Sequence, residues 1–415
     1  LALMGSAVFL WRRRNRPAAG ESAIPVVGFR WNWLLALCLA AGLLLVAAMW
    51  IETARTQPYG EWDAWAIWNL RAKFLVGPGQ TWKYAVSPLL EHTHPEYPLL
   101  TSGFIARVWK CSGGTPEWVP VATSLLFAAS VVALLVGALA LLRATSSGLL
   151  GGLVLLASTL FLVQAPAQYA DVPLSLYYLA TLVLVGWAAR AQAPGKPLVL
   201  AGAFASLAAW TKNEGIAFLV LVLAGFFLVE WRIAGWSAAF RKWRLLVLGA
   251  APAMVMVAVL KVWLIPGREP ALAQPVWEAA GKLGQFDRYA MIAKALWDET
   301  LKLGLGLGHP LVLLGILAGS LGILRPRQWR GPAAFALLTM GLSFAAYCGV
   351  YLITPQDLNW QLSTTVGRLY AQLWPGFLWA AFLVLKRVED RLKPAEPRRD
   401  SRAERRKQRG ARRQP

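Results

Sequence analysis

The chain contains long stretches in which no residue is charged and most residues are apolar. Examples are residues 34–49, 119–142, 215–229 and 311–324. A helix needs about 17–25 such residues to cross the hydrocarbon core of a bilayer. Because lipid offers no hydrogen bonds, each segment must satisfy its own backbone groups, which excludes isolated strands and lipid-exposed loops. The stretches therefore predict an all-α fold, a polytopic bundle of transmembrane helices.

Composition supports a membrane protein and not a nucleic-acid-binding one. Hydrophobic residues make up 57% of the 415 residues and charged residues only 15%, against about half and a quarter in ordinary globular domains. The net charge of +21 invites a nucleic-acid reading, but the positive charges lie where membrane topology places them, so we expect no nucleic-acid partner. The three cysteines, Cys38, Cys111 and Cys348, lack metal-ligand spacing and indicate no disulfide framework.

Hydropathy divides the chain into three regions. Residues 1–32 are expected to hold a partial N-terminal helix and a basic cytoplasmic loop, 33–386 the transmembrane domain, and 387–415 a disordered basic cytoplasmic tail. The first apolar run precedes its arginines, the reverse of a signal peptide, so it is expected to end a helix whose start is missing. The predicted spans are 33–51, 118–142, 148–164, 173–190, 197–211, 215–231, 245–264, 303–324, 332–352 and 369–386.

Basic residues predict which loops face the cytoplasm, because loops rich in Lys and Arg stay on that side. We place Arg12 to Arg16 inside and let successive spans alternate in direction across the membrane. The dense basic clusters then all fall on the inside. These are Arg143; Arg190 and Lys196; Arg232, Arg241, Lys242 and Arg244; Arg325, Arg327 and Arg330; and the C-terminal tail. The outer segments are then 52–117, 265–302 and 353–368, and the tail is expected near an anionic leaflet.

The first outer segment contains an apolar stripe at helical spacing. Trp62, Trp65, Trp68, Ala72 and Leu75 alternate with charged and polar residues. This pattern favours an amphipathic helix lying on the outer membrane surface.

Two acidic residues on the predicted outer side are candidates for catalysis. Asp63, with Glu61 two residues earlier, opens the expected amphipathic helix. A carboxylate there either favours the helix N-terminus or removes a proton from an attacking hydroxyl. Asp171 lies in a short outer turn on the same side, and with Pro173 nearby it is equally well read as a helix cap.

Two cations lie near the ends of spans on that side. Lys212 and Glu214 sit between two apolar stretches with no room for a long loop, where they either pair with each other or offer Lys212 to a phosphate. Arg368 is expected at the outer mouth of the last span. It either binds a phosphate in a bidentate manner or snorkels towards the interface.

A histidine-containing motif precedes the second apolar block. In His92-Thr93-His94-Pro95-Glu96-Tyr97-Pro98, His94, Glu96 and Tyr97 are candidates to line a substrate cleft. His and Glu side chains are residue types that bind metals, but their spacing here is not the helical His-Glu-x-x-His pattern. The metal requirement therefore stays open. The chain also lacks a Walker-type motif and Gly-x-Ser-x-Gly, which disfavours an ATP-driven pump and a serine hydrolase.

Taken in order, these motifs resemble those of a known enzyme family. The motifs are Glu61-Trp62-Asp63-Ala64-Trp65, His94-Pro95-Glu96-Tyr97-Pro98, Tyr169-Ala170-Asp171-Val172-Pro173, Thr211-Lys212-Asn213-Glu214-Gly215 and the region of Arg368. They resemble bacterial glycosyltransferases of the C superfold, in the group similar to protein O-mannosyltransferases, aminoarabinose transferases and lipopolysaccharide galacturonosyltransferases. Each motif is short, and the resemblance spans about residues 33–386.

The resemblance implies an inverting glycosyltransferase that moves a sugar from a polyprenyl-phosphate donor to an acceptor hydroxyl on a lipid, glycan or protein. It implies a multi-pass protein of the bacterial inner membrane whose active site faces the periplasm or exterior. The family's catalytic base matches Asp63, with Glu61 left open as the alternative, and its assisting acid matches Asp171. The carrier phosphate leaves with negative charge that cationic side chains should stabilise, and Lys212 and Arg368 are the candidates for that role. No cofactor is certain, and a divalent metal is possible because some members use one.

Two other functions compete with this interpretation. A membrane transporter would place charges along a path through the bilayer, and a flippase or polymerase would act on lipid-linked glycans. The glycosyltransferase hypothesis instead predicts that four side chains converge on one outer cavity: Asp63, Asp171, Lys212 and Arg368.

Overall fold

The computed structural model describes residues 26–264, 274–329 and 331–392. Within these ranges the chain is helical throughout, and its only bridge between extended residues joins Ile323 to Leu385. The prediction of an all-α fold is confirmed.

Six helices of the described residues are long and apolar enough to cross a membrane. They are α2 (Val26–Thr56), α5 (Trp118–Leu142), α8 (Asp171–Ala188), α10 (Asn213–Ala234), α11 (Trp236–Val259, continued by the π-helical η4, Leu260–Leu264) and α16 (Pro332–Ile353). The chain is therefore an integral, multi-pass membrane protein. Residues 1–25 and 393–415, which include most of the expected first and last regions, lie outside the described residues, while Val388–Leu392 forms the short helix α18.

Several predicted spans differ in their bounds, such as 245–264, whose helix begins at Trp236. Polar capping residues explain three of the differences. The span 148–164 is two helices, α6 (Thr145–Leu156) and α7 (Thr159–Gln164), because the Ser158 side chain caps the second. The span 303–324 contains the short 3₁₀ helix η5 (Gly306–Gly308) and α15 (Pro310–Leu321), which begins where His309 caps Leu311 N. The last helix, α17 (Leu358–Val384), begins eleven residues before the predicted 369 because Asp357 accepts from Trp360 N at 2.8 Å. Arg368 is thus within a helix, not before one.

The helix α8 is the centre of the bundle. Of its most apolar stretch, 89% is buried inside the protein, and it packs against α9 (Gly195–Thr211), α17 and α5. Small residues allow the closest approach beside it. A Cβ on Gly202 of α9 would lie 1.9 Å from Leu246 O of α11, and one on Gly249 would lie 1.8 Å from Val199 O. Small residues at such contacts are typical of helix pairs in membranes, because they let the backbones touch.

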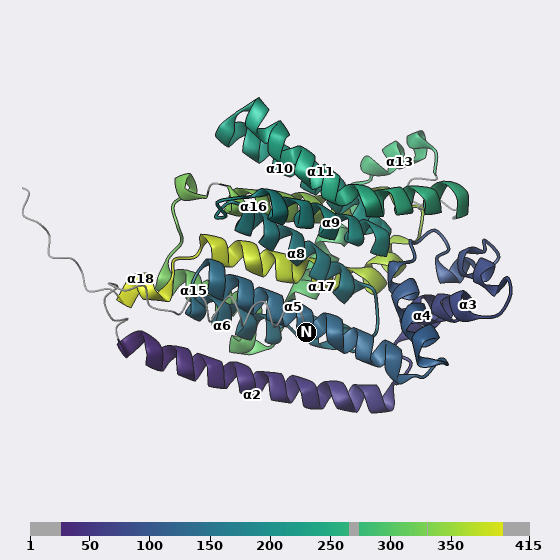
Figure 1. The fold of residues 1–415 in the computed structure, drawn as a ribbon, viewed down its shortest axis with the longest axis horizontal. Helices are drawn as coiled ribbons and strands as arrows, with labels where there is room; N and C mark the ends of the chain where they lie inside the picture. Colours follow the sequence, from purple (N-terminus) through teal and green to yellow (C-terminus); the bar gives the residue numbers. More distant parts are fainter. Residues whose placement is uncertain (1–25, 265–273, 330, 393–415) are drawn as a thin grey trace, which may run out of the picture.

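The two ends of the bundle differ (Figure 1). One end carries α3 (Asn69–Val76), α4 (Leu100–Ser112) and α13 (Val276–Leu283), and the opposite end carries α18. At the α18 end, Arg143 donates to Leu385 O and Arg190 to Leu142 O. The basic loops expected inside therefore gather at one end and the first outer segment at the other, as alternation requires. The orientation of these ends across a membrane stays a prediction.

The tryptophan-rich part of the first outer segment is helical, as expected, but its stripe divides between two environments. Trp62 and Trp65 are 60% and 47% exposed, whereas Trp68 and Ala72 are fully buried. Ser102 of α4 donates to Trp68 O at 2.9 Å. The π-helical turn η1 (Ala64–Trp68) has a wider hydrogen-bond pattern than an α-helix, so residues after it face a different side than the regular spacing predicts.

Candidate functional site

A fully buried carboxylate, that of Asp171, lies at the centre of a charged cluster. Lys212 Nζ is 3.0 Å from its Oδ1, and Arg368 Nε is 3.0 Å from its Oδ2. Gln372 also donates to Oδ1. A buried charge is tolerated when it is paired and hydrogen-bonded, and Asp171 meets both conditions.

Three separate elements bring these side chains together. Asp171 is the first residue of α8, and Lys212 lies 41 positions further on, between α9 and α10. There its backbone is extended, with φ −148° and ψ 162°, which breaks the helix and turns the side chain inward. Arg368 and Gln372 are four residues apart on α17, a spacing that places both on one face.

Asp63 joins the cluster from the first outer segment. Its Oδ2 lies 2.6 Å from Arg368 Nη2, and the two side chains are 13% and 16% exposed. The Arg368 guanidinium also lies over the Tyr169 ring, 5.0 Å from its centroid. Arg368 is therefore held by two carboxylates and one aromatic face, and Asp63, unlike Asp171, keeps access to solvent.

Glu61 lies at the exposed margin of the same group. Tyr169 Oη donates to Glu61 Oε2 at 3.4 Å. Burial of the phenol, followed by the negative charge of Asp63, raises the pKa of Tyr169, so its hydroxyl stays protonated and can donate. Glu61 is thus near the cluster but only loosely fixed.

Lys212 has a second carboxylate partner. Its Nζ lies 2.8 Å from Glu214 Oε1, and it sits over the Tyr97 ring at 5.6 Å. Burial alone would lower the pKa of Lys212, but the charges of Asp171 and Glu214 outweigh it, and the pKa is raised. The ammonium is therefore charged at neutral pH.

The histidine motif contributes to the site through Tyr97. His94 Nδ1 and Glu96 Oε1 are 2.7 Å apart. The Tyr97 ring stacks on His94 at 4.8 Å and on Trp68 at 5.8 Å. His94 and Glu96 therefore bind each other and support Tyr97, which is the member of the motif that contacts Lys212.

A buried arginine, Arg71, organises the backbone of this motif. Arg71 is fully buried and donates to Ala85 O at 2.7 Å, Tyr97 O at 2.8 Å and His94 O at 3.3 Å. Burial lowers the pKa of Arg71 to about 10, so it remains charged at neutral pH. Its three carbonyl contacts fix the backbone that presents Tyr97.

A cavity of about 630 Å³ adjoins the charged cluster. Glu214 and Tyr97 belong to its wall, together with residues of α10, α16 and α17. A second connection runs through hydrogen bonds: Tyr178 and Tyr347 hydroxyls lie 3.1 Å apart, Tyr347 donates to Gln372 at 2.7 Å, and Gln372 donates to Asp171. The volume of the cavity is within the range of sites that bind small molecules.

Lys261 brings a further cation to this cavity. It lies in the π-helical η4 and donates to Asn213 Oδ1 at 2.7 Å and to Glu96 O. A π-helical turn also follows directly after Asp63, and such turns are frequent at functional sites.

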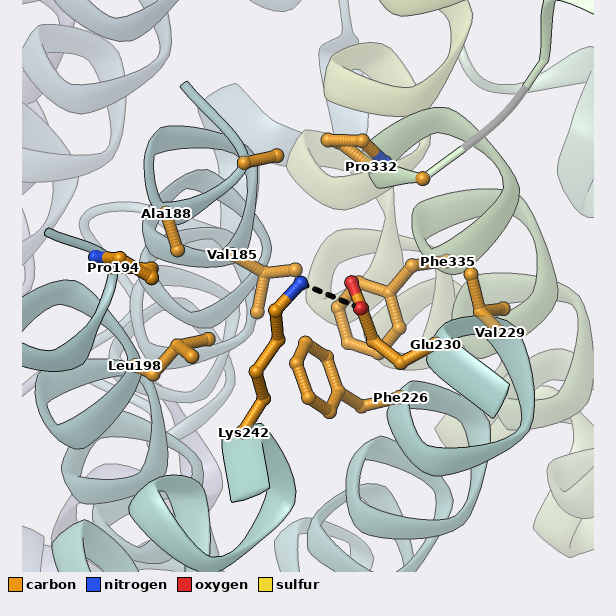
Figure 2. Close-up of a pocket in the computed structure, with 12 residues that line it drawn as sticks. Val185, Ala188, Pro194, Leu198, Phe226, Val229, Glu230, Lys242, Pro332 and Phe335 are labelled. Carbon is orange, nitrogen blue, oxygen red and sulfur yellow. Dashed lines mark hydrogen bonds and ion pairs between the residues drawn. The ribbon is translucent and has the colours of Figure 1, made fainter. Parts of the chain in front are cut away.

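A smaller cavity lies between α8, α9, α10 and α16 (Figure 2). Glu230 and Lys242 point towards each other across it, with Lys242 Nζ 2.7 Å from Glu230 Oε2. Its volume of about 30 Å³ has room for about one water molecule. This cavity is too small to hold a sugar.

Metal binding was left open by the sequence, and it stays open. Across 26–264, 274–329 and 331–392, no three side chains of His, Cys, Asp or Glu are grouped for a metal ion. The buried Asp171 is already neutralised by cations on both of its oxygens.

Asp63, Asp171, Lys212 and Arg368 lie together in one ion-pair network, but none of the four lines the cavity of about 630 Å³. Sequence reasoning also missed several neighbours. Gln372 was detectable as the residue one turn after Arg368. Lys261 was detectable as a lone charge in an apolar stretch, where ionisable residues mark functional sites. Tyr169 was quoted within its motif without a role, and only the contact with Arg368 gives it one.

Comparisons with known proteins find structural similarity only. No protein-family model matches the chain, and no curated protein does. The chain is similar to a crystal structure of ArnT from Cupriavidus metallidurans bound to undecaprenyl phosphate, with 15% identity, a TM-score of 0.48 and 86% of this chain covered. The apo structure of the same protein gives 17% identity, a TM-score of 0.47 and the same coverage of this chain.

The matched region corresponds to 60% and 61% of those two chains. ArnT is an aminoarabinose transferase, one of the groups that the sequence motifs resemble. At this level of similarity, neither structure assigns a role to any residue of this chain.

Proposed function

We propose that this protein is an inverting glycosyltransferase that takes a sugar from a polyprenyl-phosphate donor and transfers it to an acceptor hydroxyl. One observation carries the proposal. Carboxylates and cations from three distant parts of the chain, Asp63, Asp171 and Arg368 among them, form one network beside a cavity of about 630 Å³.

The reaction needs a base for the acceptor hydroxyl and positive charge for the departing phosphate. The acceptor hydroxyl oxygen forms a bond to the anomeric carbon, and its proton passes to the Asp63 carboxylate. The bond from the anomeric carbon to the donor's phosphate oxygen breaks, and its electron pair leaves with the phosphate. Arg368 and Lys212 stabilise the charge that builds on that group. Attack opposite the leaving group inverts the anomeric centre.

The geometry favours Asp63 over Asp171 as the base. Asp171 is fully buried and holds three donors, so we assign it the role of positioning Lys212 and Arg368. Asp63 is reached by solvent and shares Arg368 with Asp171. A phosphate that binds the guanidinium competes with Asp63 for it, and this competition frees the Asp63 carboxylate as the donor arrives.

The remaining partners follow from the setting of the site. The apolar surfaces of the helices suit a polyprenyl chain and membrane lipids, and the acceptor is a hydroxyl of a lipid, glycan or protein. The grouping of basic loops at the opposite end favours a site that faces the periplasm or exterior, and the family resemblance of the motifs implies the bacterial inner membrane. A transporter is less well supported, because the network lies at the α3–α4 end and not along the bundle.

The test compares Asp63→Asn with Glu61→Gln in purified protein reconstituted into lipid nanodiscs. With a polyprenyl-phosphate sugar and lipid extract as acceptor, mass spectrometry of the products measures transfer. We expect Asp63→Asn to abolish transfer while the variant inserts and folds, and Glu61→Gln to retain it. Full turnover by Asp63→Asn would exclude Asp63 as the base, and loss only in Glu61→Gln would assign the base to Glu61.

A further inference from the structure

A buried side chain, that of Gln168, connects the segment that carries Asp63 to the segment that carries Asp171. Gln168 lies in the loop between α7 and α8, three residues before Asp171. Its side chain is buried, and its amide reaches the first outer segment. This connection is separate from the ion pairs and from the cavity of about 630 Å³.

The Gln168 amide binds the first outer segment on both sides of Asp63. Gln168 Nε2 donates to Pro58 O at 2.9 Å, and Gln168 Oε1 accepts from Asn69 Nδ2 at 3.0 Å. Because a backbone carbonyl can only accept, the nitrogen of the amide must face Pro58 and the oxygen must face Asn69. Pro58 lies five positions before Asp63 and Asn69 lies six positions after it. One side chain therefore holds both ends of the stretch that carries Asp63.

The backbones of the two segments also touch beside this bridge. Glu61 N donates to Ala167 O at 3.2 Å. Gly60 lies in the left-handed region at φ +74°, and a Cβ there would lie 2.6 Å from Ala167 O and 3.0 Å from Gln168 Cδ. Glycine adopts this φ readily and leaves room for the approach. Added bulk at position 60 would therefore push the two segments apart.

Gln168 adopts a backbone conformation that is rare for residues with side chains. Its φ is +62°, and the only other non-glycine residue at positive φ among the described residues is His94, at +50°. Such conformations are strained; they persist where the surrounding structure over-determines them, and they cluster at functional sites. His94 stacks on Tyr97, which contacts Lys212, and Gln168 precedes Asp171. Both strained positions therefore adjoin the charged cluster.

We infer that Gln168 is a positioning residue for the transfer reaction, because its amide bridge sets where the Asp63 carboxylate lies relative to Asp171 and Arg368. The inference rests on the proposed function, in which Asp63 takes the proton of the acceptor hydroxyl. The ion pair with Arg368 is the one charged contact of Asp63 among the described residues, and the donor phosphate competes for it. When that ion pair opens, the bridge through Gln168 keeps the base in place.

The test compares three variants of the full-length protein in lipid nanodiscs. Gln168→Gly removes both amide bonds and relieves the backbone strain, so strain cannot cause a loss of rate. Gly60→Ala keeps Gln168 but pushes the two segments apart. Gly113→Ala is the matched control, because Gly113 also lies in the first outer segment at positive φ, +76°, and a Cβ there would meet nothing within 4 Å.

Turnover is measured with lipid extract as acceptor. The donor is whichever of a neutral, an amino and an acidic polyprenyl-phosphate sugar the unchanged protein uses fastest. For each variant we determine kcat per folded molecule, the KM for the donor, and the Tm.

We expect Gln168→Gly and Gly60→Ala to lower kcat by between about tenfold and about a hundredfold, the effect of a reacting group displaced by about 1 Å. The KM for the donor should stay nearly unchanged, because the phosphate is held by Lys212 and Arg368 and not by the bridge. Gly113→Ala should keep kcat although it incurs the same backbone strain. A purely structural role for Gln168 would lower the Tm and leave kcat per folded molecule unchanged.

A second measurement does not depend on turnover. The amide of Glu61 is bonded to Ala167 O, and it should exchange with deuterium faster in Gln168→Gly than in the unchanged protein. Peptides from α16, which lacks contact with the bridge, should exchange equally in both. Equal exchange at Glu61 would show that Gln168 does not hold the two segments together, and it would overturn the inference.

The kinetic outcomes separate the inference from the proposed function. If the unchanged protein transfers sugar and Gln168→Gly keeps its kcat, the positioning role is wrong while the proposed function stands. The same holds if Gly113→Ala loses as much rate as Gly60→Ala, or if only the KM for the donor changes. If the unchanged protein transfers none of the three sugars, the proposed function fails and the inference falls with it.

Discussion

Replacing Asp171 with asparagine removes a carboxylate that binds both Lys212 and Arg368 without changing its shape. Removing one partner of a buried ion pair costs about 3–5 kcal/mol, because a charge is left without compensation. Here each cation retains another carboxylate, Glu214 at 2.8 Å for Lys212 and Asp63 at 2.6 Å for Arg368. We therefore expect a loss near the lower limit, about 3 kcal/mol of unfolding free energy.

The measurement is an unfolding titration with a denaturing detergent, in mixed micelles, followed by the fluorescence of the 22 tryptophans. Asp63→Asn is the comparison, because that carboxylate binds only Arg368 among the charged groups described and is partly exposed. Its loss should be smaller, about 1.5 kcal/mol, the lower limit for a hydrogen bond to a charged group.

Each variant should separate stability from activity in its own way. Asp171→Asn should lose both, whereas Asp63→Asn should lose transfer and keep most of its stability. If Asp171→Asn unfolds within about 0.5 kcal/mol of the unchanged protein, as a surface substitution does, the buried network does not hold the site together and the reasoning is refuted.

Three further predictions test the phosphate site, the ion pairs and the packing. Arg368→Lys keeps the charge but loses the guanidinium fork that reaches Asp63 and Asp171 together. We therefore expect the KM for the donor to rise about tenfold, the effect of one lost charge-assisted hydrogen bond. An unchanged KM would contradict a bidentate role. The raised pKa of Lys212 means that its ion pairs stabilise the folded state below the unfolded pKa of about 10.4, and that this stability is lost as pH rises through the folded value. The Tm of the unchanged protein should therefore fall more steeply above about pH 10.4 than that of Lys212→Met, and parallel curves would refute this. Gly249→Ala places a Cβ 1.8 Å from Val199 O and should lower the unfolding free energy by about 1–3 kcal/mol through overpacking, whereas Gly341→Ala, in open space, should not.

The helical bundle and its two unlike ends were predictable from the sequence, because both follow from properties that act locally along the chain. An uncharged stretch such as 119–142 has one stable form in lipid, a helix, whatever its neighbours are. Basic loops such as the one at Arg143 sort by side for a similar reason. The predicted bounds of some spans were wrong where a polar residue caps the helix. The helix α17, for example, begins at its N-cap Asp357, well before the apolar residues do.

The sequence also supplied most members of the charged cluster, since ionisable residues near apolar spans are costly and therefore conspicuous. It left open what each one does. Asp171 read equally well as a helix cap, and only its contacts with Lys212, Arg368 and Gln372 show that it organises the site. Asp63 and Glu61 stay alternatives for the base, and the ion pair between Asp63 and Arg368 supports the proposal of Asp63.

The cavity was decided by the tertiary structure alone. Glu214 and Gln361 are 147 positions apart by their numbers, and no local pattern states that they line one space. Sequence determines where charge is costly and which segments enter the membrane, because hydropathy and charge are properties of each residue by itself. Which charges neutralise one another, and which residues line one space, depends on pairs of residues brought together by packing.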